Sequence, residues 1–118
     1  MAAKQLVKAT TGLTRLEVNP FARENLMELY DKILRTVAKM PSDAAYRQNT
    51  ESIIKGRLAL VEKETNLLKL EEQINDGHIE EVVLQAKREL KLSRQLLDCK
   101  AWEPLVAEAP KNQWKWPM

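Results

Sequence analysis

The side chains best suited to nucleophilic catalysis occur once each, because His78 is the only histidine and Cys99 the only cysteine of the chain. A nucleophile needs its base within hydrogen-bond distance. If both lie on one helix, the 21 positions from one to the other span about 31 Å at 1.5 Å per residue. We therefore predict no catalytic residue. His78 is expected to be a polar residue beside a helix start, and Cys99 a small residue on an apolar helix face.

Patterns for metal and nucleotide binding are also missing. Zinc sites take three or four Cys, His or acidic ligands at short spacing. The adjacent pairs Glu71-Glu72 and Glu80-Glu81 are better explained as solvated helix surface than as a di-metal site, which would use Glu-x-x-His motifs. No GxGxxG, Walker-type or GxSxG motif occurs in the sequence. The sequence predicts no metal, no cofactor and no small-molecule substrate.

The composition narrows the class of protein further. The 118 residues suit one domain, and 44% hydrophobic with 31% charged residues is enough for a small core. Lys and Arg number 19 against 17 Asp and Glu, so the net charge is only +2. A nucleic-acid binder usually shows a clustered basic excess, and no apolar run approaches the 18 or so residues of a membrane span. Neither a nucleic-acid partner nor a transmembrane segment is expected.

Apolar residues recur at steps of three and four along most of the chain, which predicts an all-α fold. The first helix is expected to begin at Asn19-Pro20, with Asn19 as its N-cap, and to close at Pro41. The second should follow a cap at Ser42 or Asp43. Its apolar residues form a face wide enough to contact two partners. They are Tyr46, Ile53, Ile54, Leu58, Leu60 and Val61.

Thr65-Asn66 predicts a break and a new cap, followed by a short helical turn or two. Gly77 is suited to the left-handed residue that ends this segment. The last helix should span about 78–100. We therefore predict a three-helix bundle over residues 19–100.

Residues 1–18 form a basic arm that carries Lys4, Lys8 and Arg15 before its first acid, Glu17. Basic, hydroxylated and acid-poor N-termini are typical of mitochondrial import signals. A loosely ordered arm is the alternative interpretation.

Residues 101–118 form an extended C-terminal tail, because its prolines break further helix. It holds all three tryptophans of the chain. Tryptophan is a favoured anchor at protein interfaces, although the tail can instead pack on its own bundle. The predicted partner-contacting residues are Trp102, Pro104, Trp114, Trp116 and Pro117.

Leu29-Tyr30 resembles the opening of a Leu-Tyr-Arg triplet. Proteins with that triplet are three-helix mitochondrial bundles that bind acyl carrier protein. Here Asp31 stands in place of the arginine and reverses the charge. A free-standing mitochondrial helical adaptor of this type is therefore the alternative function.

Taken over nearly its full length, the sequence resembles the alpha subcomplex subunit 5 family of mitochondrial NADH:ubiquinone oxidoreductase, respiratory complex I. The final block is the most specific, because a Trp-Lys-Trp-Pro terminus is improbable by chance. The resembling segments are Thr10-Thr11-Gly12-Leu13, Leu29-Tyr30, Lys32-Ile33-Leu34, Pro41, Ala44-Ala45-Tyr46-Arg47, Glu80-Glu81-Val82, Leu84-Gln85-Ala86, Trp102-Glu103-Pro104-Leu105-Val106 and Gln113-Trp114-Lys115-Trp116-Pro117.

The resemblance implies a helical accessory subunit without catalytic centre, flavin or iron–sulfur cluster. It implies a place on the matrix side of the mitochondrial inner membrane, as a peripheral component. The expected partners are other complex I subunits of the peripheral arm. The expected role is support of the assembly and stability of that arm, and so of respiratory electron transport from NADH to ubiquinone.

Overall fold

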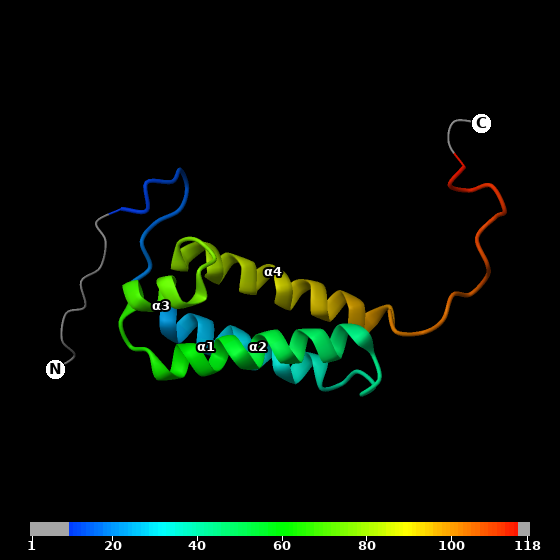
Figure 1. Ribbon diagram of the computed structural model, residues 1–118, viewed down its shortest axis with the longest axis horizontal. Coiled ribbons are helices and arrows are strands. Elements are labelled where there is room, and N and C mark those ends of the chain that lie inside the picture. The colour runs from blue at the N-terminus through cyan, green and yellow to red at the C-terminus, as the bar shows by residue number, and fades with distance from the viewer. Residues whose placement is uncertain (1–9, 116–118) are drawn as a thin grey trace.

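The computed structural model describes residues 10–115 and shows an all-helical chain (Figure 1). No strand occurs in this described part, so the predicted all-α class is confirmed. There are four helices rather than three, because the short segment after Asn66 forms a helix of its own. They are α1 (Ala22–Val37), α2 (Ala45–Lys63), α3 (Leu67–Ile74) and α4 (Ile79–Asp98). Residues 1–9 of the predicted arm, and Trp116 and Pro117 of the tail, lie outside the described residues.

Helix α1 is the central element and packs against both α4 and α2. One stripe of α1 is fully covered, as the three- and four-residue spacing predicts. It consists of Ala22, Leu26, Tyr30, Ile33 and Val37. The matching stripe on α4 runs from Ile79 to Leu90 and includes Val82, Val83 and Ala86. These two stripes form most of the hydrophobic core.

Helix α2 is covered on one side only. Ile54 and Val61 are buried against the rest of the core, whereas Ile53 is 58% exposed. Helix α1 packs against both α2 and α4, whereas the backbones of α2 and α4 stay farther apart and side chains join them. The wide apolar face predicted for α2 meets α1 and, less extensively, α3, and it leaves Ile53 exposed.

Arg23 of α1 holds the C-terminal end of α2. Its Nε donates to the carbonyl oxygens of Val61 at 2.9 Å and Glu64 at 3.2 Å, and its Nη2 donates to the Glu62 carbonyl at 3.2 Å. The last carbonyls of a helix have no partner within it and carry partial negative charge. A guanidinium from another helix therefore supplies the cap that α2 lacks locally.

Two predicted helix starts are wrong by a few residues. Helix α1 begins at Ala22, because the Asn19 carboxamide instead accepts from the Phe21 N–H at 2.9 Å in a preceding turn. Helix α2 begins after Ala44, whose N–H donates to the Pro41 carbonyl at 3.1 Å. That turn places Ser42 and Asp43 before the helix, and neither makes a capping hydrogen bond to it.

The short helix α3 has the predicted cap, because the Asn66 side chain accepts from the Leu68 N–H at 3.0 Å. Its left-handed end is Asn75, with φ of 54°, and not Gly77 as predicted. Gly77 also has a positive φ, of 86°, but it lies two residues later in the turn to α4. Asparagine tolerates this conformation because its short polar side chain bonds locally.

Candidate interaction surfaces

The predicted tail residues separate into two groups. Trp102 is half-buried and packs against the hydrophobic core, where it shares a cavity wall with Met40, Tyr46 and Leu96. Pro104 and Trp114 are exposed, Trp114 to 86%. Figure 1 shows the tail leaving the end of α4 and extending away from the helices. The first tryptophan thus contacts its own chain, and the second does not.

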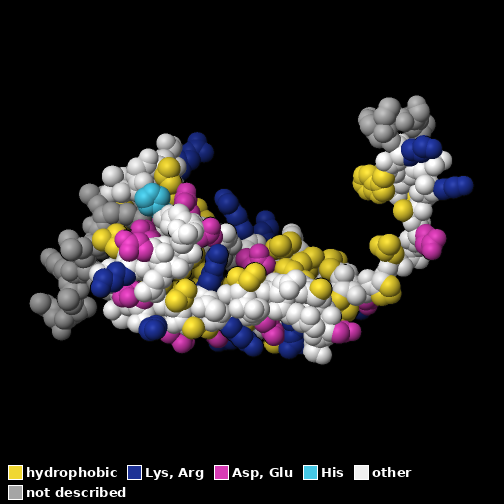
Figure 2. All heavy atoms as spheres, viewed as in Figure 1, with side chains coloured by type: hydrophobic (Ala, Val, Ile, Leu, Met, Phe, Trp, Pro, Cys, Tyr) yellow, Lys and Arg dark blue, Asp and Glu magenta, His cyan; other side chains and the backbone are white. Residues whose placement is uncertain are grey.

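Apolar side chains beyond Trp102 lie open to solvent. Leu105 is 84% exposed, Val106 is fully exposed, and both precede Trp114 along the same extended segment. The yellow side chains on this segment in Figure 2 stand apart from those of the helices. Exposed apolar residues that cluster on one segment are typical of an interaction site.

His78 and Cys99 lie at opposite ends of α4, as its N-cap and C-cap residues. The 20 residues of α4 between them span about 30 Å. Their separation agrees with the prediction. The prediction that Cys99 lies on an apolar helix face is wrong, because α4 ends at Asp98 and the Cys99 thiol is exposed.

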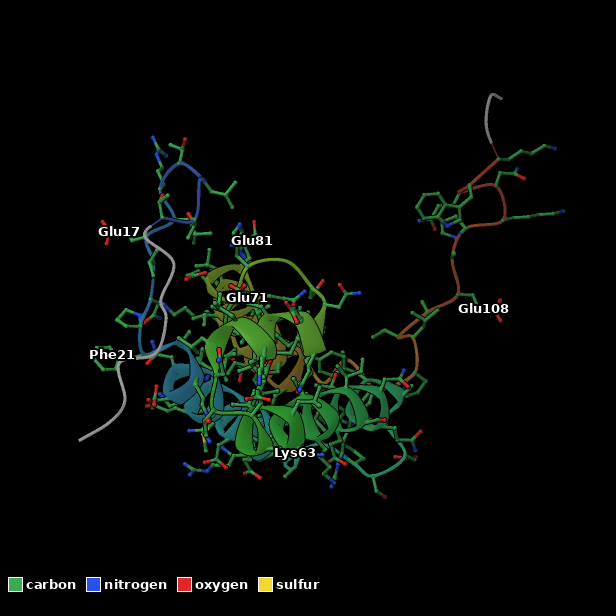
Figure 3. The ribbon with its side chains drawn as sticks, turned by 60° about the vertical axis from the view of Figure 1, so that its left-hand side comes forward. Glu17, Phe21, Lys63, Glu71, Glu81 and Glu108 are labelled. Atoms are coloured by element: carbon green, nitrogen blue, oxygen red, sulfur yellow. The ribbon has the colours of Figure 1, made fainter. Side chains whose placement is uncertain are left out.

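A polar cluster joins α3 to the start of α4. Ligand-type atoms of Glu71, His78 and Glu80 lie within 4.8 Å of one another. Figure 3 shows Glu71 at the end of the helical region that also carries Glu81, far from Glu108 on the tail. Glu80 is only 3% exposed and Glu71 is half-buried, so their prediction as solvated surface is wrong. Glu72 and Glu81 are exposed, as predicted.

Both buried carboxylates of this cluster bind backbone amides. Glu71 accepts from the Ile79 N–H at 2.8 Å, the first residue of α4. Glu80 accepts from the Asn19 N–H at 3.3 Å, just before α1. A carboxylate at a helix N-terminus is favoured by the helix dipole. Glu71, His78 and Glu80 are possible metal ligands by residue type. The observed hydrogen bonds of Glu71 and Glu80 connect α3 to the start of α4 and the start of α4 to the residue Asn19 before α1.

A groove over α1 separates α2 from α4. It encloses a cavity of about 240 Å³ whose walls come from all three helices. Tyr30 of α1 lies at its floor, 1% exposed, and its hydroxyl has no hydrogen-bond partner. At one side, Arg57 of α2 donates to Gln85 Oε1 at 2.7 Å and to Asp76 Oδ2 at 3.2 Å.

The second tyrosine lies near the same groove and does have a partner. The Tyr46 hydroxyl donates to the Glu89 carboxylate, which links α2 to α4. Burial, followed by this hydrogen bond and the charge of Glu89, raises the pKa of Tyr46 above its ordinary value. Burial also raises the pKa of Tyr30, against a smaller opposing effect of Arg57. Both phenols are therefore protonated donors.

The three residues of the Leu-Tyr-Arg-like triplet differ in how deeply they are buried. Tyr30 is buried, and Leu29 is half-buried against the core. Asp31 is exposed and forms an ion pair with Arg35, four residues later on α1. The reversed charge at position 31 is thus satisfied within α1.

Sequence reasoning missed the groove and the roles of Arg57 and Glu80. The one available signal was the width of the apolar face on α2, which exceeds what a single partner covers. For Glu80 no local signal exists, because its hydrogen-bond partner Asn19 lies 61 residues earlier.

In the residues that the structure describes, no helix has the length and apolarity needed to cross a membrane.

Comparison with known proteins places the chain among subunits of one enzyme complex. The sequence model of the family described as "ETC complex I subunit conserved region" matches residues 15–81. A Caenorhabditis elegans protein named probable NADH dehydrogenase (ubiquinone) 1 alpha subcomplex subunit 5 is 52% identical over 111 residues, covering 94% of this chain and 74% of the relative.

Two further relatives carry the same subunit designation. The Bos taurus subunit 5 is 49% identical over 113 residues, covering 96% of this chain and 97% of its own length. An Arabidopsis thaliana protein, named as a probable mitochondrial subunit 5, is 35% identical over 98 residues, covering 83% of this chain and 56% of its own. Because the family model matches residues 15–81 and relatives at 49–52% identity cover 94–96% of this chain, the chain belongs to the alpha subcomplex subunit 5 family of complex I.

Proposed function

We propose that this chain is a non-catalytic accessory subunit of mitochondrial complex I. In this proposal it supports the assembly and stability of the matrix-facing peripheral arm, and it contributes to electron transport from NADH to ubiquinone by holding other subunits in place. The observation that carries the proposal is the family relationship over nearly the whole chain. The name of the Arabidopsis relative supports the mitochondrial location.

The placement of the reactive side chains supports a non-catalytic role. The histidine and the cysteine cap opposite ends of α4. Glu71 and Glu80, the acids nearest to the histidine, already accept backbone amides from Ile79 and Asn19. Side chains with such structural tasks are poorly placed to exchange protons with a substrate.

The tail supports a role in holding partners. Trp102 fixes the point at which the tail leaves the helices. Beyond it, Leu105, Val106 and Trp114 present apolar surface to solvent. We propose that this exposed segment docks on neighbouring subunits, and that Pro104, Trp116 and Pro117 belong to the same contact. Large aromatic anchors commonly dominate the binding energy of an interface.

The first test replaces Trp114 and Trp116 together by alanine and measures incorporation into complex I on native gels. Loss of a single strong anchor costs about 2 kcal/mol or more, roughly thirtyfold in affinity. We therefore expect retention in the complex to fall by at least tenfold, with unchanged helical content of the isolated chain. The double variant Lys111→Ala/Asn112→Ala alters the same segment without removing aromatic surface and should incorporate normally.

Two results would contradict the proposal. Normal incorporation of the folded tryptophan variant would end the anchoring role of the tail. The free-standing adaptor would instead be favoured if the native chain is found only outside complex I and co-purifies with acyl carrier protein. That co-purification should then be lost when Tyr30 is replaced.

A further inference from the structure

The groove between α2 and α4 is an incompletely covered surface of the helical region. Both helices pack on α1, and the hydrogen bonds Tyr46–Glu89 and Arg57–Gln85 join them across a cavity of about 240 Å³ that Tyr30 helps to line. Figure 2 shows hydrophobic side chains mixed with a few charged ones on the face where α2 and α4 lie side by side. At about 30 Å³ for each water molecule, the volume equals that of about eight waters, which is enough for a side chain of moderate size.

The floor of this groove offers a hydrogen-bond donor that the chain does not use. The Tyr30 side chain is 1% exposed, and its hydroxyl has no partner. The Arg57 guanidinium lies close enough to the phenol oxygen to oppose the rise in its pKa, but a guanidinium has only donors and cannot accept the phenol proton. Buried polar groups are nearly always satisfied in native proteins. An acceptor from outside the chain would therefore complete this site.

The walls of the groove combine apolar side chains with a few polar ones. Ile53 is 58% exposed at one side, while Ile54 and Ala86 are buried beside the floor. Glu89 also lines the cavity, and one of its oxygens accepts from Tyr46. A carboxylate has acceptor sites for further donors.

The charges around the cavity decide which acceptor fits. The guanidinium of Arg57 is balanced by Asp76, with which it forms an ion pair of 3.2 Å. Glu89 has no cationic partner among the residues that line the cavity, because Tyr46 donates to it as a neutral group. An incoming carboxylate would meet this uncompensated negative charge. A carboxamide matches the site better, since it carries an acceptor for Tyr30 and donors for Glu89.

We infer that the groove receives an Asn or Gln side chain projecting from a neighbouring complex I subunit. Its carbonyl oxygen accepts from the Tyr30 hydroxyl, its amide group faces Glu89, and its stem lies against Ile53. This inference rests on the proposed function, because it places the occupant on another subunit of the complex. It differs from that function in assigning a second contact, separate from the tail.

Tyr30→Phe separates this role from a purely structural one, because it removes only the unpartnered hydroxyl. In the isolated full chain we expect an unchanged or higher denaturation midpoint, since no hydrogen bond is lost. In the complex we expect about two- to tenfold weaker retention against wild-type competitor. A variant that is retained like the wild type, or that lowers the midpoint of the isolated chain, overturns the inference.

Solvent protection tests whether the groove is occupied. In a chain whose exposed native thiol is removed by Cys99→Ser, the variant Ile53→Cys is labelled with a water-soluble maleimide, both in purified intact complex I and in the isolated chain. We expect at least tenfold slower labelling in the complex. Ser52→Cys, on an exposed neighbouring position of α2, is the matched control and should label at similar rates in both.

Equal labelling of position 53 in both states overturns the inference and leaves the proposed function intact. Protection of position 53 already in the isolated chain also overturns the inference, because the occupant would then be the tail or a second copy.

Glu89→Gln tests the chemistry of the side chain that occupies the groove. Tighter retention of this variant would indicate a carboxylate guest and overturn the carboxamide assignment, whereas weaker retention supports it. Absence of the wild-type chain from complex I refutes the proposed function itself.

Discussion

Single side chains in this protein take their roles from partners that lie far away in the sequence. Tyr30 and Tyr46 are both aromatic members of helix stripes, yet only Tyr46 has a partner, Glu89, 43 residues later on α4. Glu80 is buried, and it accepts from the Asn19 amide, 61 residues earlier. Residue type and helical spacing predict which positions face inward, but they do not identify the polar partner that each receives.

The raised pKa values of the two tyrosines predict how stability depends on pH. In the folded chain both phenols keep their protons above pH 10, the ordinary value, because burial disfavours the charged form. In the unfolded chain the two phenols ionise at about pH 10. Their contribution is therefore fully present below that pH and is lost as the pH rises beyond it.

We expect the free energy of unfolding to fall more steeply above about pH 10 in the wild type than in Tyr46→Phe, measured by denaturant titration at several pH values. Tyr46→Phe should also lower stability at neutral pH, because Glu89 loses its donor. Equal slopes in the two proteins would show that Tyr46 ionises alike in both states.

At the scale of elements, apolar periodicity locates each helix well and its ends less well. Asn66 caps α3 as predicted, because its side chain and the helix start are local to each other. The starts of α1 and α2 are displaced by turns at Asn19 and Pro41. The C-terminal end of α2 is capped by Arg23 of α1, and no local pattern in α2 contains that information.

Replacing Arg23 by Met keeps the apolar stem and removes the guanidinium. We expect the free energy of unfolding to fall by about 1.5–3 kcal/mol, the range for hydrogen bonds to charged groups. Arg35→Met is the matched control on the same helix. Arg35 makes an exposed ion pair with Asp31, so the loss should be about 0.5 kcal/mol or less. Similar losses in the two variants, measured by denaturant unfolding, would argue against interhelical capping.

At the scale of the whole molecule, the tail and the helices differ in what covers their apolar groups. The helices cover most of theirs with one another, although Ile53, Leu84 and Leu92 remain exposed. The described tail covers only Trp102 and leaves Leu105, Val106 and Trp114 exposed. This difference separates the stability of the isolated chain from its ability to bind partners.

Trp102→Ala should lower the free energy of unfolding of the isolated chain by about 1–2 kcal/mol. Replacing a fully buried tryptophan costs about 3–5 kcal/mol, and the loss is smaller here because the indole is half-buried. The triple variant Leu105→Ala/Val106→Ala/Trp114→Ala should change it by about 0.5 kcal/mol or less. A large loss in the triple variant would mean that the tail packs on its own helices in solution.

Helical periodicity and characteristic end segments are properties of the linear chain, so the all-α class, the approximate helix positions and the family could be predicted from residue order. Which face of α2 stays open, and which tyrosine has no partner, could be seen only once the helices were packed. Packing likewise decided that Glu80, one of two adjacent acids, is buried. These depend on how three helices meet around α1, and contacts between residues tens of positions apart leave no periodic trace in the sequence.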